Sequence, residues 1–141
     1  MASLAHTPAM DTDSVRELTV GALLREAAEQ SPAAPALVEG VPDPQDRRRW
    51  TYSDLLAEAE QAARALLGRF QPGERVAVWA NNIPEWVVLE MGAALAGTTL
   101  VTVNPALRED ELRHVLRQSR AAGIFLVGDR VVPPEEVVEP E

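Results

Sequence analysis

The sequence predicts an α/β fold built on a parallel sheet, and three observations support that prediction. Segments with strand and helix patterns alternate from residue 75 to residue 127, in the order strand, helix, strand, helix, strand. The segment 75–80 is almost continuously apolar, which is typical of a strand buried on both faces of a sheet. Hydrophobic residues make up 46% of the 141-residue chain, enough for a core. Such βαβαβ units form parallel sheets with right-handed crossovers.

Before this unit, the sequence predicts two flanking helices and a short β-hairpin. Thr19 is a good N-cap for a helix over 20–30, whose apolar residues share one face, namely Val20, Leu23, Leu24, Ala27 and Ala28. Strand patterns over 35–39 and 49–52 flank a loop rich in Pro and Asp. We expect these two strands to pair as a hairpin with a long tip.

The second helix follows the hairpin directly. Thr51 and Asp54 have the spacing of a capping box, so the helix is expected to begin just after Thr51. It closes near Gly68. Its apolar stripe comprises Leu55, Leu56, Ala59, Ala62, Ala63, Leu66 and Leu67.

Each element of the alternating unit has its own signal. Pro84 suits the first turn of a helix that ends near Gly97 and is apolar almost all round, so we expect it to be buried on most sides. A strand over 98–103 ends at Asn104-Pro105. An amphipathic helix over 108–120 and a last strand over 124–127 complete the unit. The inward residues of that amphipathic helix are Leu112, Val115 and Leu116.

Three regions follow from this pattern. Residues 1–18 lack periodicity and predict a flexible N-terminus. Residues 19–128 form the folded part. Residues 129–141 are acidic and rich in proline, which predicts a disordered tail or an extended linker.

Composition excludes several classes of function. The net charge of -9 speaks against a broad nucleic-acid surface. The chain has no cysteine, which excludes disulfides and thiolate sites, and it has no lysine, which excludes a Walker-type phosphate loop within it. No apolar run has the length of a membrane span and no secretory signal is evident. We therefore expect a cytoplasmic protein that binds no nucleic acid.

Few residues suggest chemistry by themselves. His6 and His114 lie far apart in sequence, and we interpret both as solvated rather than as ligands or bases. Glu85 sits at a helix start, where the helix dipole stabilises a carboxylate. Gly92 is interpreted as a site of close helix packing rather than part of a dinucleotide fingerprint. The arginines 47–49 are interpreted as a solvated loop tip rather than an anion site. No catalytic residue and no metal ligand is expected in the chain.

Two segments, taken in order, carry a resemblance to a known family. Trp50-Thr51-Tyr52-Ser53-Asp54-Leu55 is similar to the first short motif of the AMP-forming acyl-CoA synthetases and their adenylating relatives. Residues 91–105, a small-residue helix ending in glycine, a strand and then Asn104-Pro105, resemble the second motif. The end of that strand looks most like the fatty-acyl-CoA ligase branch. The resemblance covers 19–127 and implies part of the larger N-terminal domain of such a synthetase.

The resemblance implies a parent enzyme that uses ATP with magnesium to convert a carboxylate to an acyl adenylate, then transfers the acyl group to CoA. The family's phosphate loop, adenine segment and catalytic lysine lie further along than Glu141, so we expect this chain to need no cofactor and to be inactive alone. Some members place a basic residue just after the Asn-Pro pair to contact the CoA phosphates. In this sequence Ala106 follows Pro105, so Arg108 is the candidate, against the alternative of an exposed helix start.

Two alternatives remain open. In the first alternative to a synthetase fragment, the chain is a non-catalytic binding or oligomerisation module that keeps the fold. In the second, it is the start of an adenylation domain that loads a carrier protein. Its expected partners are the remainder of the synthetase and a second copy. We expect a homo-oligomer because open sheet edges and the apolar helix 86–96 would lack their partners in the larger domain.

Overall fold

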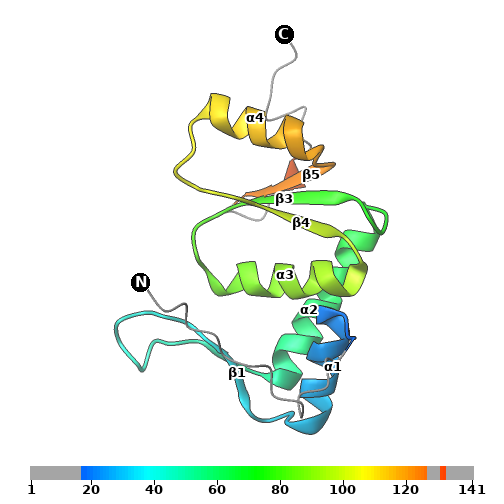
Figure 1. Cartoon of the computed structure of the whole chain (residues 1–141). Helices are drawn as coiled ribbons and strands as arrows, with labels where there is room; N and C mark the ends of the chain where they lie inside the picture. Colours follow the sequence, from blue (N-terminus) through cyan, green and yellow to red (C-terminus); the bar gives the residue numbers. More distant parts are fainter. Residues whose placement is uncertain (1–16, 127–130, 133–141) are drawn as a thin grey trace, which may run out of the picture.

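The computed structural model describes residues 17–126 and 131–132. Helix α4, a sheet, helix α3 and helix α2 are stacked in that order, and the hairpin projects at the end opposite α4 (Figure 1). Helix α1 lies beside α2 and contacts both α2 and α3. The predicted α/β class is confirmed.

The sheet contains β3 (Arg75–Trp79), β4 (Thr99–Val103), β5 (Gly123–Leu126) and β6 (Val131–Val132), in the order β4-β3-β5-β6. Strand β3 is central and pairs in parallel with β4 and β5, as the alternating pattern predicts. Its residues Val76, Ala77 and Val78 are buried. Strand β6 pairs antiparallel with β5. Two residues of the expected tail therefore belong to the sheet, and the other residues of 129–141 lie outside the described part.

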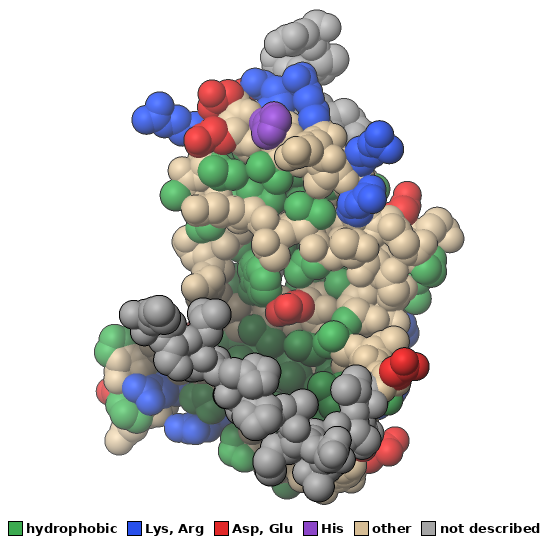
Figure 2. Space-filling model, viewed as in Figure 1, with side chains coloured by type: hydrophobic (Ala, Val, Ile, Leu, Met, Phe, Trp, Pro, Cys, Tyr) green, Lys and Arg blue, Asp and Glu red, His purple; other side chains and the backbone are tan. Residues whose placement is uncertain are grey.

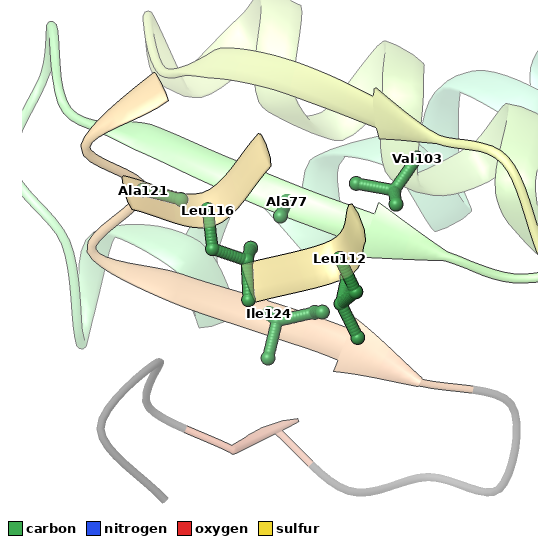
Figure 3. Packing of buried hydrophobic residues seen from close by; sticks show 6 residues of the cluster. All are labelled: Ala77, Val103, Leu112, Leu116, Ala121 and Ile124. Carbon is green, nitrogen blue, oxygen red and sulfur yellow. The ribbon is translucent and has the colours of Figure 1, made fainter. Parts of the chain in front are cut away.

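Helix α4 (Glu109–Ser119) covers one face of the sheet (Figure 3). Its inward residues Leu112 and Leu116 form a buried cluster with side chains of the sheet and of the turn before β5: Ala77, Val103, Ala121 and Ile124. The exposed side carries the i,i+4 pair of Arg113 and Glu109, whose atoms lie 2.8 Å apart. The predicted amphipathic helix is confirmed, with Val115 only half buried.

Helix α3 (Pro84–Ala96) covers the other face and lies between the sheet and α2 (Tyr52–Leu67). Pro84 occupies its first turn, and Gly97 ends it with φ of 71°, in the left-handed region that glycine adopts without strain. A Cβ atom added at Gly92 would lie 2.6 Å from the Cβ atom of Ala62. The close packing expected at Gly92 is therefore confirmed.

Helix α1 (Val20–Gln30) and the hairpin of β1 (Pro35–Val38) and β2 (Arg49–Thr51) pack at the far end of the molecule. The Thr19 hydroxyl accepts a hydrogen bond from the Ala22 amide at 3.1 Å, as predicted. The expected apolar stripe is only partly correct, because Val20 and Leu23 are 55% and 53% exposed. The buried residues of α1 are instead Gly21, Leu24 and Ala28. They follow an i, i+3, i+7 spacing that faces α2 and α3.

The capping box that begins α2 is confirmed. The Asp54 amide donates to the Thr51 hydroxyl oxygen at 3.1 Å, and the Thr51 amide donates to the Asp54 carboxylate at 3.0 Å. The Thr51 hydroxyl also donates to the Asp54 carboxylate at 2.7 Å, and this bond, together with the one from the Thr51 amide, holds the pKa of Asp54 below its ordinary value. In the stripe that follows, Leu67 is exposed at the last turn, while Leu55, Ala59, Ala63 and Leu66 are buried.

The expectation of a homo-oligomer, which relied in part on the apolar helix 86–96, stays a prediction, because most apolar side chains of that helix, α3, are half buried. Among the described residues, the large hydrophobic side chains left exposed are Leu18, Val20, Leu23, Val38 and Leu67, and none of them lies in α3. That helix is packed from two sides. Within the same residues, no helix combines the length and the apolar character needed to span a membrane.

Candidate functional site

The carboxyl edge of the sheet is the first place where the fold favours a site. Strands β3 and β4 are neighbours, and the chain leaves β3 toward α3 on one face and β4 toward α4 on the other. Open α/β sheets commonly bind ligands beyond the carboxyl ends of adjacent strands whose connections diverge in this way. In this chain the loops 80–83 and 104–108 follow those two strand ends.

These two loops are tied together by Trp79 and Asn104. The indole Nε1 of Trp79 donates to the backbone carbonyl of Asn104 at 3.1 Å. The Asn104 side-chain oxygen accepts from the Ala106 amide at 2.9 Å, and its carbonyl accepts from the Leu107 amide at 3.1 Å. Asn104-Pro105 therefore ends β4, as predicted, in a turn whose polar groups bond to one another rather than facing a ligand.

Arg108 stands at the end of this second loop. It is exposed at the N-cap of α4, and its backbone amide donates to the Glu111 carboxylate at 2.9 Å. Glu109, Asp110 and Glu111 fill the first turn, so negative charge already complements the helix N-terminus. A CoA phosphate at Arg108 would meet these carboxylates. The role of Arg108 in CoA binding stays a prediction.

A cleft of about 440 Å3 opens on the other side of the β3–α3 loop. One wall is formed by the end of β1 and the residues after it, and the other by Asn82, Ile83, Pro84 and Val87. Figure 2 shows recessed hydrophobic side chains between the hairpin and the body of the molecule. The first wall comprises Leu37, Val38, Glu39, Gly40 and Val41. The lining of the cleft as a whole is mostly apolar, so the cleft suits an apolar group better than a nucleotide phosphate.

Arg48 crosses from the hairpin to α3 at this cleft. Its Nε and Nη2 atoms donate to both carboxylate oxygens of Glu39 at 2.8 and 2.9 Å. Its Nη1 atom donates to Glu85, in the first turn of α3, and its guanidinium carbon lies 5.3 Å from the ring centroid of Trp50. Hydrogen bonds from Arg48 hold the pKa values of Glu39 and Glu85 below their ordinary value, and the same bonds raise the pKa of Arg48.

The interpretation of 47–49 as a solvated loop tip is therefore incomplete. Arg48 links two elements, and Arg47 donates from Nε to the Val41 carbonyl at 2.8 Å. The sequence did hold a signal for the first contact. Glu39 and Arg48 are the next residues beyond the paired Val38 and Arg49, so an antiparallel hairpin brings their opposite charges together. The contact with Glu85 had no such signal, because it joins residues 37 positions apart.

The remaining candidates do not gather into a site. His114 is exposed on α4, and His6 lies outside the described residues. Within 17–126 and 131–132, no group of three His, Asp or Glu side chains is arranged to hold a metal ion. Arg108 and the cleft are also separate, because α4 and α3 lie on opposite faces of the sheet.

Comparison with known proteins identifies relatives. A sequence profile of the family described as AMP-binding enzyme matches residues 24–140. The putative acyl-CoA synthetase YngI of Bacillus subtilis is 34% identical over 110 residues, which are 77% of this chain and 19% of that protein. The human mitochondrial medium-chain acyl-CoA ligase ACSF2 is 37% identical over 101 residues, 71% of this chain and 16% of that protein. The chain thus spans less than a fifth of the length of these relatives.

Solved structures give the same relationship. A fatty acyl CoA synthetase of Mycobacterium tuberculosis superposes with a TM-score of 0.70 at 31% identity, covering 77% of this chain and 21% of that one. The N-terminal domain of FACL13 from the same organism superposes with a TM-score of 0.73 at 28% identity, covering 86% of this chain and 33% of that one. The match lies in the N-terminal portion of the relatives.

Proposed function

This chain belongs to the AMP-binding enzyme family, and from that premise we propose that it is the N-terminal part of a fatty-acid–CoA ligase. The parent would activate a carboxylate with ATP, forming an acyl adenylate and releasing pyrophosphate. It would then transfer the acyl group to the thiol of CoA, releasing AMP. The observation that carries the proposal is the 34% identity over 110 residues to a putative acyl-CoA synthetase.

The chain's own residues would supply scaffold rather than chemistry. The sequence contains no lysine, and the described residues form no metal-binding group. We propose that ATP and magnesium are held by parts of the parent outside this chain. The buried β3, with α3 and α4 on its two faces, would give those parts a rigid base.

A pyrophosphate-release assay tests the division of roles. The 141-residue chain is incubated with ATP, magnesium, CoA and a panel of fatty acids, beside the product of the complete reading frame. We expect turnover from the complete product and none from the chain. Turnover by the chain at the level of the complete enzyme would contradict the fragment proposal.

The reading frame beyond Glu141 separates the alternatives. A phosphate loop and a later lysine in that frame support a ligase, and a stop codon supports a module without catalysis. If the complete product forms acyl adenylate but loads a carrier protein instead of CoA, the parent is an adenylation enzyme.

The proposed CoA contact needs its own measurement in the complete enzyme. Arg108→Ala removes an exposed guanidinium beside the β4–α4 loop, and Arg117→Ala removes one from the last turn of the same helix. A CoA-phosphate contact predicts a higher KM for CoA in the first variant alone, with the KM for ATP unchanged. Equal KM values for CoA in both variants would exclude Arg108.

A further inference from the structure

The base and the tip of the hairpin are held in different ways. At the base, Trp50 is 8% exposed, packs with Leu24, Leu55 and Ala59, and donates from Nε1 to the Glu58 carboxylate at 2.9 Å. The hairpin tip, defined as residues 39–48, lacks such a core anchor. Among the described residues, its polar link to α3 is the contact of Arg48 with Glu85.

That link crosses the cleft. Glu39 and Val41 of the hairpin tip line one wall, and Pro84, the neighbour of Glu85, lines the other. Arg48 binds Glu39 in a bidentate fork and Glu85 with the outer nitrogens of the same guanidinium. One cation therefore bridges two carboxylates that belong to the two sides of the cleft. Without it, the two carboxylates would repel each other.

We propose that Glu39, Arg48 and Glu85 form a latch that holds the hairpin tip over the cleft. When the contact between Arg48 and Glu85 breaks, the hairpin tip moves away from α3 and exposes the apolar lining, while the base stays packed around Trp50. The hairpin tip is thus a lid, and the cleft has an open and a closed form.

The exposure of the latch fits a contact that can open and close. The side chains of Arg48 and Glu85 are 49% and 56% exposed, so water and salt compete for their contact. The bidentate geometry with Glu39 at 20% exposure favours Arg48 staying with the hairpin. The weaker, more exposed side of the latch is therefore the side toward α3.

The absence of cysteine makes the distance across the cleft measurable. In the full chain, Gln45→Cys on the hairpin tip and Asn81→Cys in the β3–α3 loop accept spin labels at exposed positions that do not line the cleft. Pulsed electron resonance then gives the distribution of distances between the labels. We expect one narrow distance distribution in the doubly labelled chain that keeps Arg48 and Glu85. Adding Arg48→Ala or Glu85→Gln should give a broader distance distribution with a longer mean.

Two matched variants control for loss of charge. Arg49→Ala removes a neighbouring exposed arginine, and Glu90→Gln neutralises an exposed carboxylate on the same helix as Glu85. Both should keep the narrow distribution. Broadening of similar size in the controls would overturn the latch proposal. A distance distribution that is already broad in the labelled chain with Arg48 and Glu85 intact would overturn it as well.

Amide hydrogen exchange separates a lid from a general loss of structure. In Arg48→Ala the Glu39 amide, which donates to the Arg48 carbonyl at 3.0 Å, should exchange severalfold faster, whereas the amides of β3 and α2 should keep their rates. Faster exchange throughout, with a shift in Trp50 emission, would mean that Arg48 supports the whole fold, which would also overturn the proposal.

Discussion

Helices α3 and α4 do the same topological task on opposite faces of one sheet, yet their sequences differ completely. Helix α3 connects β3 to its neighbour β4, and helix α4 connects β4 to β5, on the other side of β3. Helix α4 packs on the sheet through Leu112 and Leu116 and shows charged residues to solvent. Helix α3 packs on the sheet through Ala93 and Ala96 and on α2 through Gly92, and its apolar residues continue around the helix.

This difference shows that the distribution of apolar residues around a helix indicates how many of its sides are packed against other elements. A helix with one covered side needs one apolar stripe, whereas a helix between two layers needs apolar residues on both sides. The same reasoning explains the glycine at position 92. A helix packed between two layers must approach both, and at this crossing a methyl group would already collide with Ala62.

The largest loss of stability is expected in α4, which packs on the sheet through a single apolar stripe. Leu112 is 2% exposed, so Leu112→Ala removes a fully buried side chain from the cluster between α4 and the sheet. Losses of this kind cost about 2–5 kcal/mol in the free energy of unfolding. Leu89→Ala on α3, where the side chain is only half buried, should cost less. Urea denaturation of both variants measures the order, and a larger loss at Leu89 would break the comparison.

The second largest difference is expected when a glutamate is introduced on the side of each helix that faces away from the sheet. Met91 of α3 packs toward Leu24 and Leu55, whereas His114 of α4 is exposed. Met91→Glu places a carboxylate among apolar groups and should lower the free energy of unfolding by about 1–3 kcal/mol. His114→Glu should change it by no more than about 0.5 kcal/mol. Thermal unfolding followed by circular dichroism tests this pair. Equal losses would mean that α3 is no better covered than α4.

The glycine at the α2–α3 crossing gives a sharper test of close packing. Gly92→Ala gains about 1 kcal/mol in helix propensity, but its Cβ atom would lie 2.6 Å from the Cβ atom of Ala62. Overpacking of this kind costs about 1–3 kcal/mol, so we expect a net loss. Gly68→Ala is the matched control, because its φ is -71° and its nearest contact would be 3.4 Å. A gain at position 92 would show that the two helices can separate cheaply.

The capping box predicts a smaller loss at the other end of α2. Thr51→Ala removes the hydroxyl that accepts from the Asp54 amide, and lost caps cost about 0.5–2 kcal/mol. Thr102→Ala, an exposed threonine in β4, controls for the change of residue type. Chemical denaturation midpoints measure both variants. An unchanged midpoint for Thr51→Ala would mean that Asp54 and water satisfy the helix start without it.

Local patterns predicted most of the fold. Thr51 with Asp54, Pro84 with Gly97, and the apolar run of β3 each fix an element through interactions near in sequence. The incorrect predictions concern features that depend on contacts between residues far apart in the sequence. Val20 and Leu23 share the apolar composition of α1, but the helix turns Gly21 toward Leu95, so the buried stripe is shifted. Strand β6 is only two residues long and depends on pairing with β5.

The candidate site was less predictable than the fold. The cleft joins residues 37–41 to residues 82–87, and no periodicity brings two loops so far apart together. Arg48 was visible in the sequence as one of three arginines, and only its neighbours in space distinguish it from Arg49. Arg108 came from family resemblance alone, and its role in CoA binding stays a prediction.

The smallest effect concerns the electrostatic link of the hairpin to α3, and it depends on pH. The pKa values of Glu39 and Glu85 are lowered in the folded chain, chiefly by hydrogen bonds from Arg48. A lowered folded pKa stabilises the fold above the unfolded pKa, and that contribution is lost as the pH falls through the folded value. Arg48→Ala should therefore lower the urea midpoint at pH 7, and this deficit should shrink as the pH falls below the unfolded glutamate value of about 4.3 and through the lowered folded values.

The control for this pH dependence is Arg49→Ala, which removes the same charge from the neighbouring position, the first residue of β2. Asp54 also has a lowered pKa, but its partner is Thr51, so its titration occurs in every variant and cancels in the difference. The deficit of Arg48→Ala relative to Arg49→Ala thus isolates Glu39 and Glu85. A deficit that persists undiminished at pH 3 would mean that Arg48 acts through its packing on the ring of Trp50, 5.3 Å away, rather than through its charge.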